Sequence, residues 1–203
     1  MRPVSSAMMM IFGTAALAVL FQPAQAQEAS CYVAQGNMEE ASQRPSPLGH
    51  TVFSIDDREA MICYGRPSAR GRTVMGDLVP FGQPWRLGAN EATAIHLPFA
   101  AEVGGVDLEP GSYSIYAVPG EEEWTFFLNS NHERWGVPID ADVRAAEVGS
   151  FTRPAESTDE MVEQLTFRWE AHGQGMGSLV MEWENTRVEI PVHGPGMVHQ
   201  DSR

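Results

Sequence analysis

Lysine is absent from this 203-residue sequence, in which all 13 basic residues are arginine. Schiff-base catalysis, lysine-activated serine chemistry and phosphate loops of the G-x-x-x-x-G-K type all need a lysine amine. Positive charge is also scarce, because 27 acidic residues leave a formal net charge of −14. Such a chain repels nucleic acid and anionic membrane surfaces, so we expect neither as a partner.

Motifs for metals, cofactors and common hydrolases are missing as well. The six histidines show no H-x-H, H-x-x-x-H or H-E-x-x-H spacing, and no EF-hand loop follows the paired aspartates. There is no G-x-S-x-G, and no G-x-G-x-x-G follows an expected strand. We therefore expect no metal and no cofactor. A site assembled from distant histidines, or a Ser/His/Asp set drawn from separate strands, remains open.

Long apolar runs are limited to residues 8–21, whose 14 residues fall short of a membrane-spanning helix. Arg2 precedes this run, and the small-residue pattern Ala24-Gln25-Ala26 follows it. This order is typical of a secretory signal, so we expect cleavage of residues 1–26 and a periplasmic or secreted protein without a stable membrane anchor.

Cysteine occurs twice, as Cys31 and Cys63. An exported chain without a C-x-x-C motif favours a disulfide between them, and two unpaired buried thiols are the alternative. Closing this loop stabilises a fold by roughly 3–4 kcal/mol.

Alternation of apolar and polar residues dominates the rest of the chain and predicts short β-strands. We expect an irregular N-terminal lead-in over residues 27–49, a β-domain over 50–192 and a flexible tail over 193–203. Turns are predicted at Asp56-Asp57-Arg58, PGEEE, HGQGMG and Asn185-Thr186, and a short helix is possible near residues 140–146. Nine or ten short strands predict an all-β fold, an antiparallel β-sandwich or jelly-roll-like domain. The strand-like segments are HTVFSI, EAMICY, ATAIHLPF, AAEV, SYSIYAV, EWTFFLN, MVEQLTFRWEA, GSLVMEWEN and RVEIPV.

A long connection begins at Arg66, where four arginines and one acid occur before residue 87 in an acidic chain. Glycines and prolines interrupt any regular element, and loops of this length in compact domains are usually functional or disordered. Its apolar residues can fold it over one end of the sandwich. Two tryptophans, Trp85 and Trp135, lie in expected loops and are candidates for ligand stacking, whereas Trp124, Trp169 and Trp183 lie in expected strands and favour core packing.

The segment YGRPSARGRTVMGDLVPFGQPWRLGANEAT resembles the signature of the bacterial family called domain of unknown function 2911. Further similarity occurs in LEPGSYSIYAVPGEEEW and WENTRVEIPV, so the resemblance covers roughly residues 45–192. It implies an exported protein and carries no established activity. Phe81 departs from the tyrosine that is usual in the motif.

Five residues of this segment form the predicted ligand site, and they are Arg66, Trp85, Arg86, Asn90 and Glu91. Guanidinium groups supply paired donors to an anion or carboxamide, and an indole supplies a stacking wall. The alternative is that the arginines attach the loop to the sheet through backbone carbonyls, Asp77 and Glu91. In either case Arg70 and Arg72 are expected to be solvated.

Three functions are consistent with this sequence. The first is a non-enzymatic binding or accessory module for a small anionic ligand or the acidic segment of a partner protein. The second is a hydrolase-type enzyme in which Glu91 acts beside Arg66 or Arg86 as an acid or base. The third is a structural envelope protein without a small ligand.

Overall fold

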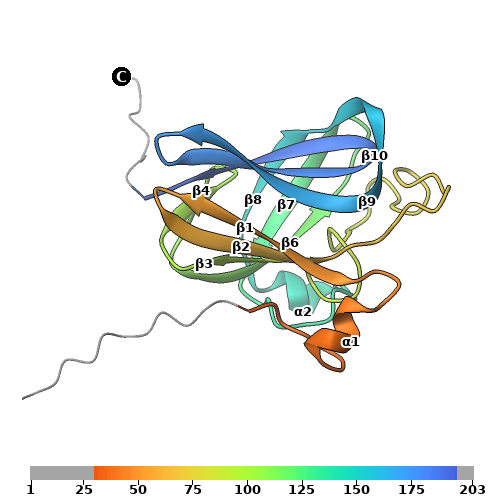
Figure 1. Cartoon of the computed structure of the whole chain (residues 1–203), viewed down its shortest axis with the longest axis horizontal. Helices are drawn as coiled ribbons and strands as arrows, with labels where there is room; N and C mark the ends of the chain where they lie inside the picture. Colours follow the sequence, from red (N-terminus) through yellow and green to blue (C-terminus); the bar gives the residue numbers. More distant parts are fainter. Residues whose placement is uncertain (1–29, 196–203) are drawn as a thin grey trace, which may run out of the picture.

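The computed structural model describes residues 30–195, which form an all-β sandwich of two antiparallel sheets (Figure 1). The predicted signal segment 1–26 and residues 196–203 of the predicted tail lie outside the described residues. No helix in the described part of the chain has the length and apolar character needed to cross a membrane.

The larger sheet has six strands in the order β1-β2-β3-β6-β7-β8. Its strands are β1 (Leu48–Ile55), β2 (Arg58–Gly65), β3 (Ala94–Leu97), β6 (Gly111–Val118), β7 (Glu123–Asn129) and β8 (Glu147–Pro154). The predicted turn at Asp56-Asp57 is confirmed, because Ile55 pairs with Arg58 and both aspartates have the positive φ of a tight hairpin. Strand β3 follows the long connection and pairs with both β2 and β6.

The smaller sheet has four strands in the order β5-β4-β10-β9. Its strands are β4 (Ala101–Val103), β5 (Val106–Leu108), β9 (Glu156–Gly173) and β10 (Met176–His193). The β9–β10 hairpin turns at Gln174 and Gly175, both with positive φ, as the HGQGMG segment predicts. Two short helices complete the structure, α1 (Met38–Ser42) in the lead-in and α2 (Ala141–Arg144).

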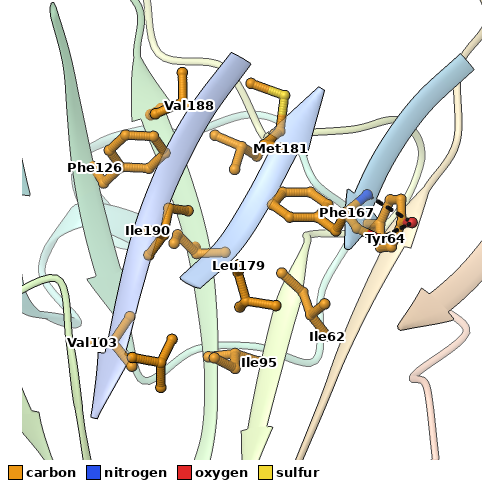
Figure 2. Packing of buried hydrophobic residues seen from close by; sticks show 14 of the residues in the cluster. Ile62, Tyr64, Ile95, Val103, Phe126, Phe167, Leu179, Met181, Val188 and Ile190 are labelled. Carbon is orange, nitrogen blue, oxygen red and sulfur yellow. Dashed lines mark hydrogen bonds between the residues drawn. The ribbon is translucent and has the colours of Figure 1, made fainter. Parts of the chain in front are cut away.

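Side chains from the inner faces of both sheets form one hydrophobic core (Figure 2). On β7 the alternating residues Trp124, Phe126 and Leu128 are almost fully buried, as the sequence pattern predicts. Tyr64 of β2 crosses the core, and its hydroxyl accepts a hydrogen bond of 3.0 Å from the Phe167 amide of β9. Burial of apolar area holds the two sheets together, and this polar contact fixes their alignment.

One expected turn and two expected boundaries are wrong. The lead-in was expected to be irregular over residues 27–49, but α1 lies within it and β1 begins at Leu48. The expected turn at Asn185-Thr186 is absent, because β10 runs without a break from Met176 to His193. The polar pair lies at a register shift of the hairpin, where Glu184 has positive φ and the Asn185 amide donates to the Thr158 carbonyl. Bulges and turns both favour polar residues, so the sequence pattern alone could not distinguish a bulge from a turn here. His193, predicted to lie in the flexible tail, ends this strand and its ring lies 3.1 Å from the Glu102 carboxylate.

Strands β5 and β8 were not predicted. β5 has three residues and is too short for alternation to be recognised. β8 alternates between half-buried and exposed positions, but its inward residues include glutamate, glycine and arginine. The ten strands within residues 30–195 agree with the expected nine or ten, because β5 and β8 are added while two of the nine expected segments merge into β10.

The predicted disulfide is present between Cys31 of the lead-in and Cys63 of β2. It joins the irregular segment before β1 to the second strand of the larger sheet. A disulfide is compatible with an extracytoplasmic location.

Candidate functional site

The Arg-rich loop, residues 66–93, follows β2 and crosses to the smaller sheet (Figure 1). The Ala69 amide donates to the Glu163 carbonyl at 2.8 Å, and the Leu165 amide donates to the Pro67 carbonyl at 2.9 Å. Further along, the Glu184 carboxylate accepts from two successive loop amides at 3.1 and 3.2 Å. The first half of the loop is therefore attached to β9 by backbone hydrogen bonds and to β10 through the Glu184 carboxylate.

The second half of the loop returns to the larger sheet at Trp85. Trp85 and Ala117 of β6 exchange both backbone hydrogen bonds, at 2.7 and 2.9 Å. The Trp85 ring stacks on Trp183, with centroids 5.9 Å apart, and meets Trp124 edge-on. One face of this indole is therefore packed against the core, and the side chain is half-buried rather than fully exposed.

Glu91 is buried at the end of the loop and binds the lead-in. Its carboxylate accepts two hydrogen bonds from Nη1 of Arg44, at 2.9 and 2.8 Å, and one from the Ala34 amide at 3.1 Å. The Arg44 guanidinium also lies over the Trp135 ring, 5.7 Å from its centroid. The charge partner of Glu91 is thus an arginine outside the loop.

Asn90 and Arg66 face the lead-in and the start of β1. The Asn90 side-chain amide donates to the Ser46 carbonyl at 2.9 Å, and its backbone has a φ of 64°. The aliphatic part of Arg66 packs against Gly49, where an added Cβ would lie 2.6 Å from Cδ. The Arg66 Nε atom is buried and has no hydrogen-bond partner within residues 30–195.

A cavity of about 360 Å³ lies under the loop and is called the loop cavity below. Trp85 and Arg86 are the two predicted site residues that border it, and Arg72 and Gln83 add further polar groups. Its remaining walls are mostly apolar, formed by Ser46, Pro67, Leu78, Val79, Pro80, Pro84, Gly88, Ala89, Val137 and Trp183. The five predicted side chains therefore divide between this cavity and the contact with the lead-in.

Arg86 is the central charge of the loop cavity. Its side chain is half-buried, and its Nε atom makes a long hydrogen bond of 3.4 Å to the Gly88 carbonyl. Burial lowers the pKa of Arg86, and the negative charge of Glu91 opposes part of that shift. No carboxylate within the described residues forms a salt bridge with Arg86. This guanidinium is therefore partly dehydrated without a counter-ion in direct contact.

A second and larger cavity, about 950 Å³, lies between the lead-in and the ends of β3 and β6. We call it the histidine cavity because His96 and His132 border it, with ring centroids 6.1 Å apart and planes nearly perpendicular. His96 Nδ1 lies 2.7 Å from the Ser112 hydroxyl. Burial lowers the pKa of His96, and the nearby His132 lowers it further.

A family model described as "Protein of unknown function (DUF2911)" matches residues 46–192. The chain belongs to this family. The match confirms the resemblance seen in the sequence and includes the whole Arg-rich loop. No curated protein and no solved structure matches the chain. The family description names no activity, so a function has to be argued from the two cavities.

Gly65, inside the family motif, allows the two ends of the loop to touch. A Cβ at this position would lie 1.9 Å from the Ala89 carbonyl oxygen, a backbone atom that cannot move aside. We expect Gly65→Ala to lower the free energy of unfolding by about 2–3 kcal/mol, in the upper range for overpacking. Urea unfolding followed by tryptophan fluorescence measures this loss. Gly111→Ala is the control without a clash, because Gly111 likewise has no positive φ and the nearest atom to its added Cβ lies 3.5 Å away.

Sequence reasoning missed the part of the site that the lead-in provides. Arg44 lies in a polar, proline-containing segment and carries no periodic signal, although it is the charge partner of Glu91. Arg72 was expected to be solvated and is exposed, yet it also borders the loop cavity. Gln83 borders the same cavity and was not singled out. Their proximity follows from tertiary contacts that no local pattern reports.

Proposed function

We propose that this protein is an exported, non-enzymatic binding module that holds a small organic anion in the loop cavity. The observation that carries the proposal is Arg86, a half-buried guanidinium without a salt bridge in residues 30–195. An uncompensated, partly dehydrated cation favours an anion strongly, because the anion restores the hydrogen bonds and charge that water supplied.

The other cavity walls favour an organic anion over a fully hydrated one. Trp85, Leu78 and several prolines present apolar surface, while Arg86, Arg72 and Gln83 provide the polar groups. Small-molecule sites typically combine apolar walls with a few converging polar groups, and the volume of about 360 Å³ lies within their usual range. A ligand with one carboxylate group and an apolar body would match these polar groups and apolar walls.

The position of Glu91 supports binding rather than acid–base chemistry. Its two carboxylate oxygens accept hydrogen bonds from Arg44 and from the Ala34 amide, and the side chain is buried. A general base must reach a substrate proton, either directly or through one water molecule. Glu91 faces the lead-in, and it does not border the loop cavity.

Binding of phenylacetate tests the proposal, with inorganic phosphate and 2-phenylethanol as comparisons. We expect phenylacetate to bind and to change the fluorescence of Trp85, whereas the uncharged alcohol lacks the anionic group and phosphate lacks the apolar body. Replacing the charged donor in Arg86→Gln should weaken phenylacetate binding by about tenfold or more. Isothermal titration calorimetry measures both affinities.

Arg70→Gln is the matched control, because Arg70 is an exposed arginine of the same loop that does not border the cavity. Its replacement should leave phenylacetate affinity unchanged. An equal loss of phenylacetate affinity in the two variants would show that the effect comes from the change in net charge and not from the position of Arg86. Absence of binding by both phenylacetate and phosphate would overturn the proposal and favour a structural role.

A further inference from the structure

The histidine cavity lies apart from the Arg-rich loop and differs from the loop cavity in composition. One wall is the lead-in, with Tyr32, Val33 and Met38, and another is formed by His96 and Leu97 of β3 and by the start of β6. His132 and Glu133, from the connection between β7 and α2, form the third side. No arginine borders it, and Glu133 is the one acidic residue among the described residues that line it.

His96 carries an unsatisfied polar atom at this cavity. The residue is only 6% exposed, and its Nε2 atom has no hydrogen-bond partner among residues 30–195. A buried polar atom without a partner destabilises the fold, because it has lost its water without gaining a hydrogen bond. A ligand that bonds to Nε2 would supply this hydrogen bond.

Which nitrogen of the His96 ring carries the proton determines whether the ligand group must be a donor or an acceptor. When Nδ1 donates its proton to the Ser112 hydroxyl, 2.7 Å away, Nε2 has a free lone pair and accepts a hydrogen bond. The lowered pKa of His96 keeps the ring uncharged at neutral pH. A donor on the ligand therefore selects this tautomer.

The charges around the cavity favour a cationic donor. Glu133 is largely exposed, with 67% of its side-chain surface accessible, and its Oε1 lies 3.9 Å from His132 Nε2. The adjacent Arg134 is turned away and donates to the carbonyls of Trp135 and Gly136 at 3.1 and 3.2 Å. The formal net charge of −14 adds a long-range attraction for cations.

We propose that the histidine cavity binds a small organic ammonium ion with an apolar body. The ammonium group donates to Nε2 of His96 and lies near the Glu133 carboxylate. Its apolar body packs against Val33, Met38 and Leu97, and Tyr32 adds an aromatic surface suited to a cation. Because Nε2 of His96 is itself buried, this binding mode requires the neighbouring His132 side chain, which is 27% exposed, to turn aside.

Three compounds of nearly equal shape test this site on the full chain: phenethylammonium, 2-phenylethanol and phenylacetate. We expect phenethylammonium to bind at pH 7.5 and to shift the ring ¹⁵N resonance of His96 Nε2. The alcohol should bind more weakly, and phenylacetate should leave the His96 resonance unchanged. Glu133→Gln should weaken phenethylammonium binding by about threefold to fivefold, the size expected for a partly exposed charge pair.

Glu121→Gln is the matched control, because it removes another exposed acid, from the turn between β6 and β7. It changes the net charge by the same amount and should leave the affinity within error of the wild type. Equal effects of the two variants, equal binding of the ammonium ion and the alcohol, or an unmoved His96 resonance would each overturn the proposal. Phenylacetate binding in the loop cavity is independent of all three outcomes.

Discussion

Replacing Glu91 by glutamine is expected to lower the free energy of unfolding by about 3 kcal/mol. The change leaves the Arg44 guanidinium opposite a neutral amide in a site where Glu91 retains only 3% of its side-chain exposure. Breaking one half of a buried ion pair is costly because the remaining charge has lost its water without keeping its partner. We expect the lower end of the usual range, because 18% of Arg44 is exposed. Urea unfolding measures the change.

Asp56→Asn is the matched control for Glu91→Gln. Asp56 faces Arg58 across 4.0 Å, and about half of each side chain is accessible to water. Such surface pairs contribute little, so the loss should stay below about 0.5 kcal/mol. The double variant Arg44→Met with Glu91→Leu should recover part of the stability, because neither charge is then left unpaired. A Glu91→Gln loss no greater than that of the control would contradict this account of Glu91.

Removing the disulfide by Cys31→Ser with Cys63→Ser is expected to lower the free energy of unfolding by about 3–4 kcal/mol. The bond closes a loop across a sequence separation of 32, and the value follows from the lost restriction of the unfolded chain. The lead-in then depends on noncovalent contacts, chiefly those of Glu91 and Asn90. Urea unfolding of the variant and of the oxidised wild type measures the difference.

Limited proteolysis shows where the loss of the disulfide acts. Cleavage of the cysteine-free variant should begin within residues 30–45, before the β-sandwich is cut, because this segment becomes the least stable part of the chain. Reduced wild-type protein should behave in the same way. Equal protease resistance of oxidised and cysteine-free protein would show that the lead-in is held without the bond.

The sandwich could be predicted because its strands carry their own signal. Trp124, Phe126 and Leu128 alternate on β7, and Asp56-Asp57 joins two alternating runs, so local rules determine both elements. Strand β10 was harder to predict, because the polar residues at its Glu184 bulge are also typical of a turn. Only the pairing with β9, in which Glu184 lies opposite Val162, distinguishes the two.

The candidate site was predicted only in part, because its contacts join residues that are far apart in the sequence. The sequence singled out Glu91 as a charge partner, but the pairing arginine lies 47 residues earlier in a segment without periodicity. It also placed Trp85 correctly in the loop without showing that backbone bonds to Ala117 hold the indole against the core. Residue types are visible in a sequence, whereas the direction in which a loop side chain points depends on the packed fold.

The lead-in contributes lining residues to both cavities, and its disulfide has a consequence for one of them. Ser46 borders the loop cavity, residues 30–33 border the histidine cavity, and Cys31 is the covalent attachment of this segment. A newly synthesised chain whose thiols are still reduced lacks that attachment, although its strands and core can already form. We therefore expect the wall of the histidine cavity, which includes Cys31 itself, to gain its covalent attachment only on oxidation, whereas Ser46 of the loop cavity is joined directly to β1 through Pro47.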